Sequence, residues 1–158
     1  MGNRAFVIFT AKGEHSPAVY LHWNGGPESI YTMLDALVEF GQRPYDESYT
    51  CARFIQLVGN YFGGTLSLGV QNAGSPETWP AAFDCGDNGL YVIEWTGTRE
   101  YGVERFIGGS RMTEAFCKRE RAKAKKHSYN KDGALLSDIR AVNKAFTEKA
   151  VYDKISST

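Results

Sequence analysis

The side chains best suited to chemistry stand together in one short turn, at His22, Trp23 and Asn24. Near neutral pH an imidazole can serve as a general base or a metal ligand, and the two glycines that follow allow a ligand or a second chain to approach the backbone closely. The other histidines are His15, in a predicted loop, and His127, in a predicted helix, so neither is placed to assist. No H-x-x-x-H pair or cysteine-rich spacing indicates a zinc site. The favoured interpretation is a structural corner in which Trp23 packs and its polar neighbours hydrogen-bond to backbone groups.

A second polar group, Asp84, Asp87 and Asn88, closes a long segment without periodicity. Carboxylate and amide oxygens could bind a hard cation, but the bidentate glutamate of an EF-hand loop is missing. An Asx-turn is therefore the favoured role. An enzyme built around His22 with Asp87 nearby stays open as a further class of function.

The glycine and serine patterns exclude two common catalytic classes. Residues 59–64 are rich in glycine, but they end a predicted helix and so lack the helix N-terminus that binds phosphate. The chain contains no Walker Gly-Lys-Ser/Thr and no G-x-S-x-G. We therefore reject nucleotide hydrolysis and serine hydrolysis, and we predict no catalytic residue, no metal and no cofactor.

The cysteines and the N-terminal residues indicate the compartment. Cys51, Cys85 and Cys117 are far apart and odd in number, which fits reduced thiols better than a disulfide framework. The first residues lack the apolar core of an export signal, and no apolar run approaches the roughly 20 residues of a membrane helix. We expect a cytoplasmic protein without membrane contact.

The formal net charge is zero, but the charges are unevenly divided along the chain. Residues 1–110 carry six Lys or Arg and twelve Asp or Glu, whereas residues 111–158 carry twelve and six. This division indicates either a basic surface for an acidic partner or a solvated helix face that partly offsets the acidic part. No aromatic residue interleaves the basic run, so contacts to nucleic acid would be electrostatic and salt-sensitive. The basic residues in question are Lys118, Arg119, Arg121, Lys123, Lys125 and Lys126.

The apolar patterns predict an α+β domain that positions these residues. Two helices, one starting at Pro27 and one capped by Asp46, each carry an apolar stripe that must be buried, most simply against a sheet. Gly41 is typical of the residue just past a helix C-terminus. Segment 71–88 has no periodicity but holds two large aromatic residues, so it should pack onto the domain. Five strands are predicted at 5–10, 18–22, 65–70, 90–95 and 102–107. In 65–70 the residues alternate, which predicts a half-buried strand with Leu66, Leu68 and Val70 on its apolar side.

Two helices are predicted near the end of the chain, a basic one at 112–127 and an amphipathic one at 134–155. We therefore predict an antiparallel sheet of about five strands, with the first two helices on one face and a basic C-terminal helical extension. Residues 1–107 should form the α+β core domain, and residues 108–158 the basic C-terminal helical segment.

Four stretches resemble a family of small, mostly uncharacterised proteins carried by phages, plasmids and integrative elements. They are residues 2–5 (GNRA), 20–26 (YLHWNGG), 59–69 (GNYFGGTLSLG) and 87–93 (DNGLYVI), and the similarity covers residues 2–95. The genomic setting of that family implies an accessory role such as counter-defence, for example inhibition of CRISPR or restriction machinery. The basic C-terminal part lies outside the resemblance, so its role is interpreted from its charges alone.

Two functions follow as expectations. The first is a non-catalytic, mobile-element protein that binds and inhibits a host defence protein or ribonucleoprotein complex in the bacterial cytoplasm. Its partner-binding residues would be His22, Trp23, Asn24, Asp87 and Asn88. The second is a nucleic-acid-binding accessory protein that uses the six basic residues of the C-terminal helix.

Overall fold

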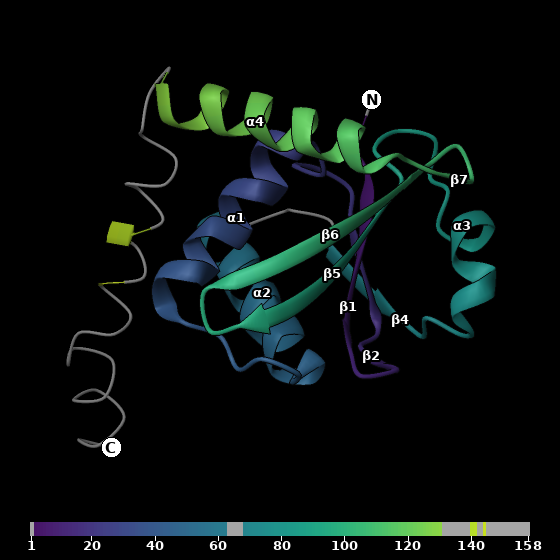
Figure 1. The fold of residues 1–158 in the computed structure, drawn as a ribbon, viewed down its shortest axis with the longest axis horizontal. Helices are drawn as coiled ribbons and strands as arrows, with labels where there is room; N and C mark the ends of the chain where they lie inside the picture. The colour runs from purple at the N-terminus through teal and green to yellow at the C-terminus, as the bar shows by residue number, and fades with distance from the viewer. Residues whose placement is uncertain (1, 63–67, 131–139, 142–143, 145–158) are drawn as a thin grey trace.

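The computed structural model describes residues 2–62, 68–130, 140–141 and 144. These residues form an α+β structure with one mixed sheet, and the helices lie against that sheet (Figure 1). Within the described ranges, no helix is both long enough and apolar enough to cross a membrane.

The sheet has seven strands, and its centre is a parallel pair. The spatial order is β4-β3-β1-β5-β6-β7, and β2 pairs with β1. β1 and β5 are parallel, with Phe6 opposite Leu90, while every other pairing among the described strands is antiparallel. The strands are β1 (Ala5–Ala11), β2 (Glu14–His15), β3 (Ala18–Leu21), β4 (Leu68–Gln71), β5 (Leu90–Gly97), β6 (Glu100–Ile107) and β7 (Ser110–Arg111).

The prediction of an antiparallel sheet of about five strands is therefore wrong in its strand count and in the direction of one pair. β2 and β7 have two residues each, which is too short for an alternating pattern to be recognised. The β1–β5 pair joins strands far apart in the chain, and local patterns do not encode that pairing. Parallel neighbours need a long crossover, and here the intervening helices and strands supply it.

Both predicted N-terminal helices form where expected. Helix α1 (Pro27–Phe40) starts with proline in its first turn and is followed by Gly41 at φ 68°. Helix α2 (Glu47–Phe62) is capped by Asp46, whose Oδ1 accepts a hydrogen bond from the Tyr49 N–H at 2.9 Å. The remaining helices are a short 3₁₀ turn η1 (Pro76–Thr78), α3 (Trp79–Ala82) and α4 (Glu114–Asn130).

One face of the sheet holds the larger core. Apolar side chains of β1, β3 and β5 pack there against α1 and α2, including Ile30, Leu34 and Phe54. Ala124 of α4 is buried in the same cluster. Three helices therefore contribute to this core, rather than the two that were predicted, and α4 crosses over α1 and packs against it (Figure 1).

The opposite face is covered by the segment between β4 and β5. The prediction that this segment packs onto the domain is confirmed, although the face that it covers was not predicted. Trp79 and Phe83 from this segment are buried with Ile8 and Val92 of the sheet. The Trp79 indole N–H donates to the carbonyl of Ala73 at 2.9 Å, which ties the segment together locally.

Two predicted elements lie partly or wholly outside the described residues. The predicted strand 65–70 is seen as β4 from Leu68 onward, and Val70 is 55% exposed rather than buried because β4 is an edge strand. The predicted helix 134–155 falls outside the described residues except at 140–141 and 144, and Arg140 there forms an ion pair with Glu39 of α1.

Candidate functional site

Three segments that are distant in sequence meet at one corner of the molecule. The Asn3 N–H donates to the carbonyl of His22 at 2.9 Å, and the Gly25 N–H donates to the carbonyl of Asn3 at 2.8 Å. The N-terminal residues therefore bind both ends of the turn that follows β3. We call this arrangement, together with the loop before β5, the motif corner; it comprises Asn3, Arg4, His22, Trp23, Asn24, Gly25, Asp87 and Asn88.

The loop before β5 closes the motif corner through Arg4. The Arg4 Nε donates to Asp87 Oδ2 at 2.8 Å, and the Arg4 backbone N–H donates to the same oxygen at 3.0 Å. Asn88 binds alongside, because its backbone N–H donates to the Arg4 carbonyl at 3.0 Å and its amide donates to Asn3 Oδ1. The hydrogen bonds from Arg4 lower the pKa of the Asp87 carboxyl to about 2. At neutral pH this carboxylate is therefore charged and hydrogen-bonded to Arg4, which makes it a poor general acid or base.

The tryptophan of the turn projects outward, so the favoured interpretation that Trp23 packs is wrong. Trp23 is 42% exposed, and its ring stands edge-on to the His22 imidazole with centroids 4.9 Å apart. The Tyr20 hydroxyl is 2.9 Å from His22 Nδ1 and holds the imidazole. Asn24 has φ 59°, a left-handed conformation that asparagine tolerates better than most residues. The turn therefore presents the Trp23 indole outward, next to a His22 imidazole that Tyr20 holds in place.

All five residues predicted to bind a partner lie in the motif corner. His22, Trp23 and Asn24 adjoin Asp87 and Asn88 through the backbone and side chains of the N-terminal segment. The prediction omitted Asn3 and Arg4, although they belong to the GNRA stretch of the resemblance. Asp84 forms the Asx-turn that was favoured, because its Oδ1 accepts from the Gly86 N–H at 3.2 Å.

The acidity of Asp87 gives a direct test of the corner. Its carboxyl is expected to titrate near pH 2, well below the ordinary value of about 3.9. Because the folded pKa is lowered, the stability that this pair contributes is present above the unfolded pKa and is lost as the pH falls towards 2. Carboxyl-detected NMR should show the low pKa in the wild type and a normal value in Arg4→Gln. A normal Asp87 pKa in the wild type would contradict the ion pair.

Helix α4 separates the six predicted basic residues into two groups. Lys118, Arg119, Lys123, Lys125 and Lys126 are exposed, and the Lys118 side chain is 76% exposed even though it pairs with Glu114 at 3.0 Å. Arg121 instead faces inward: it pairs with Asp35 of α1 at 3.1 Å, and its guanidinium lies 4.4 Å from the Tyr101 ring centroid. Arg121 therefore anchors the helix, and the other five residues form its outer face.

A buried arginine joins α4 to the motif corner. Arg105 of β6 is 1% exposed, pairs with Glu120 of α4 at 2.8 Å and lies 3.6 Å from the Tyr91 ring centroid. It also donates to the carbonyls of Asn88 at 2.6 Å and Leu90 at 3.0 Å. Sequence reasoning placed Arg105 in a strand but missed this role. The only available signal was a charged residue within a strand, and that signal does not identify the partner.

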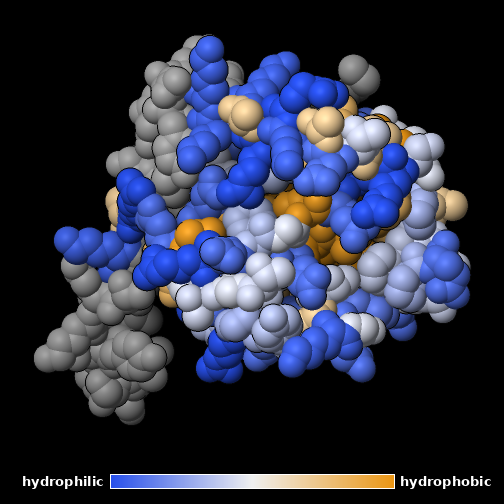
Figure 2. All heavy atoms as spheres, viewed as in Figure 1, coloured by the Kyte–Doolittle hydropathy of each residue, from blue (hydrophilic) through white to orange (hydrophobic). Residues whose placement is uncertain are grey.

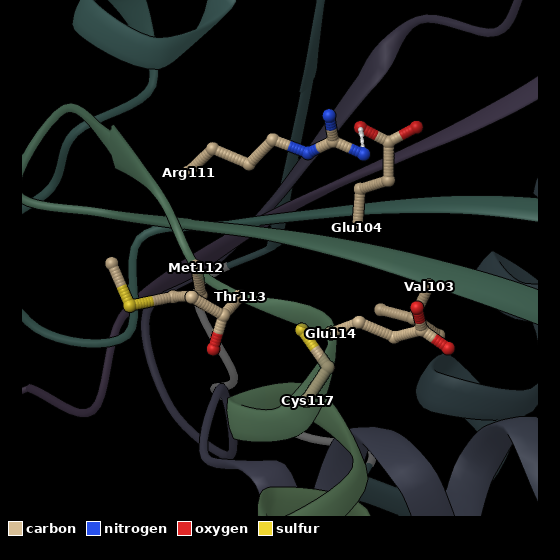
Figure 3. Close-up of a pocket in the computed structure, with 7 residues that line it drawn as sticks. All are labelled: Val103, Glu104, Arg111, Met112, Thr113, Glu114 and Cys117. Atoms are coloured by element: carbon tan, nitrogen blue, oxygen red, sulfur yellow. Dashed lines mark ion pairs between the residues drawn. The ribbon is translucent and has the colours of Figure 1, made fainter.

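A hollow of about 520 Å³ lies between β6, β7 and the start of α4 (Figure 3). Glu104 and Arg111 form an ion pair at its edge, with 3.3 Å between Oε2 and Nη2. Thr113 caps α4 by accepting a hydrogen bond from the Phe116 N–H at 3.1 Å. Burial raises the pKa of the Cys117 thiol, so this thiol stays protonated at neutral pH and is a weak nucleophile. The hollow thus shows no activated nucleophile.

Within the described part of the chain, no three His, Cys, Asp or Glu side chains gather into a group that could hold a metal ion. Comparison with known proteins finds no matching family model, no similar curated protein and no similar solved structure.

Proposed function

We propose that this protein is a non-catalytic binding protein of a mobile element, and that it inhibits a host defence complex that handles nucleic acid by docking the motif corner onto it. One observation carries the proposal: residues from three of the four stretches of the resemblance meet in one hydrogen-bonded corner that presents an exposed Trp23. These residues are far apart in the sequence, and the fold brings them together beside an exposed aromatic side chain.

The chemistry of the corner suits binding. Tryptophan is enriched among the residues that dominate protein–protein affinity, because it offers a large apolar area and an N–H donor. Hydrogen bonds from Asn3, Arg4 and Asn88 hold the surrounding backbone. Because this backbone is already ordered, little conformational entropy is lost when a partner binds. The partly exposed Arg4–Asp87 pair adds charged groups to the same corner, and interfaces commonly combine an apolar centre with a polar rim.

The same contacts disfavour the enzyme interpretation. The carboxyl of Asp87 is held by Arg4, and Nδ1 of His22 is in contact with the Tyr20 hydroxyl. Because Arg4 engages the Asp87 carboxylate, Asp87 is not poised to act as a base or to pair with His22 in proton transfer, so the corner favours recognition over catalysis.

A capture experiment tests this function. Tagged wild-type protein, expressed in a bacterium with active CRISPR and restriction systems, is expected to recover a component of one of them. Trp23→Ala should reduce the recovery by about 30-fold, which corresponds to a contact of about 2 kcal/mol. Tyr45→Ala is the matched control, since Tyr45 is an aromatic residue of similar exposure in the linker between α1 and α2.

Two outcomes would contradict the proposal. One is the absence of any defence component from the wild-type capture. The other is equal recovery with Trp23→Ala and wild type, which would mean that the motif corner is not the contact.

A further inference from the structure

The outer face of α4 has an ordered arrangement of cations. At about 100° per residue, Ala115, Arg119, Ala122 and Lys126 follow one another along its crest. Cations stand on both flanks of this crest, with Lys123 on one side and Lys118 and Lys125 on the other. The visible side of α4 is accordingly mainly hydrophilic (Figure 2). A partner thus meets positive charge both along the crest, where cations alternate with alanines, and on its two flanks.

The inward face of α4 holds the helix against the rest of the protein through two ion pairs, and one of these pairs keeps a carboxylate away from the outer face. Glu120 is turned beneath the helix to Arg105, and Arg121 is turned to Asp35. Ala124 is buried in the main core between these contacts and the next turn. The outer face therefore has Glu114 as its only carboxylate among the described residues 114–126, and that carboxylate is at the N-terminal end. The outer face of α4 is therefore positively charged, and the contacts of the inward face hold the helix in place.

We propose that the outer face of α4 seats in the major groove of double-stranded DNA, with its five exposed cations, on the crest and its flanks, on the phosphates of the two strands. The fit is geometric: an α-helix is about 10–12 Å across with its side chains, and the major groove of B-form DNA is about 12 Å wide. The span from Lys118 to Lys126 is about 12 Å along the helix axis. The alanines of the crest, Ala115 and Ala122, allow close approach of the helix to the groove because they carry no side chain beyond Cβ.

The same geometry distinguishes duplex DNA from other nucleic acids. The major groove of an RNA duplex is deep and narrow, which excludes a helix of this width. Single strands are bound by stacking their bases on aromatic side chains, and the exposed positions of α4 from 115 to 126 hold only Ala, Lys and Arg. Double-stranded DNA is thus the favoured partner of this face.

Fluorescence anisotropy with three labelled probes of one mixed sequence tests the proposal: a 20-base-pair DNA duplex, the matching RNA duplex and the DNA single strand. The DNA duplex should bind most tightly, and its affinity should fall with KCl with a logarithmic slope of about −4, as four or five phosphate contacts require. The triple variant Arg119→Gln/Lys123→Gln/Lys126→Gln should weaken binding more than about tenfold and flatten the slope by about 3.

The control variant Lys12→Gln/Arg43→Gln/Arg53→Gln removes the same charge from residues outside α4 and should retain binding with the wild-type slope. Circular dichroism confirms that both triple variants are folded. Equal affinity for the RNA duplex or the single strand would overturn groove docking, and equal loss in the two triple variants would overturn the assignment to α4. Trp23→Ala should bind DNA as the wild type does, so this result is separable from failure of the proposed function.

Discussion

Replacing Glu120 by alanine is expected to lower the free energy of unfolding by about 3–5 kcal/mol, which is the usual cost of leaving one partner of a buried ion pair without its counter-charge. Arg105 is 1% exposed, so its guanidinium would lose a carboxylate 2.8 Å from Nε without gaining access to bulk water. Its remaining contacts are the carbonyls of Asn88 and Leu90 and the Tyr91 ring, none of which carries a negative charge.

Urea unfolding at pH 7 measures the effect, and two further variants isolate its cause. Arg111→Ala breaks the exposed Arg111–Glu104 pair on the same side of the molecule, and it should cost less than about 1 kcal/mol. The double change Arg105→Met/Glu120→Leu removes both charges together and should be less destabilising than Glu120→Ala alone. If Glu120→Ala costs no more than Arg111→Ala, the Arg105–Glu120 pair does not fasten α4 to the sheet.

Local signals in the sequence predicted the elements whose boundaries depend on one or two residues. Pro27 and Gly41 indicate the start and end of α1, and Asp46 indicates the cap of α2; all three act through neighbouring backbone groups and occur as predicted. The strand at 65–70 shows the limit of the same approach. Alternation predicted a buried Val70, but burial depends on position within the sheet, and β4 lies at its edge.

The candidate site depended on contacts that no local pattern encodes. Asp87 and Arg4 are 83 residues apart, and the pair forms only because β1 and β5 are parallel neighbours at the centre of the sheet. The role of Arg105 could not be predicted either, because its carboxylate partner Glu120 lies on a helix that was predicted to be an appended extension. The expectation that residues 1–107 fold on their own stays a prediction, and the Arg105–Glu120 pair crosses that boundary.

Gly89 lies at the junction between the motif corner and β5. This residue has φ 64°, and an added Cβ would lie 2.1 Å from the carbonyl oxygen of Phe106 on β6. Such a contact is impossible, so Gly89→Ala must push β5 away from β6 at the point where Arg105 binds both the loop and the sheet. We expect a loss of about 2–5 kcal/mol, which combines left-handed strain of about 1–2 kcal/mol with overpacking of about 1–3 kcal/mol.

Gly108 provides a matched control because its φ is 61° and an added Cβ would meet nothing within 4 Å. Gly108→Ala should therefore show the left-handed strain alone, about 1–2 kcal/mol. Urea unfolding of both variants separates the two causes, and an NMR titration of Asp87 in Gly89→Ala should show its pKa rising towards the ordinary value as the corner opens. Equal losses of stability in the two variants would mean that β6 yields to the added methyl group at no cost, and that the corner does not depend on the close approach of Gly89 to Phe106.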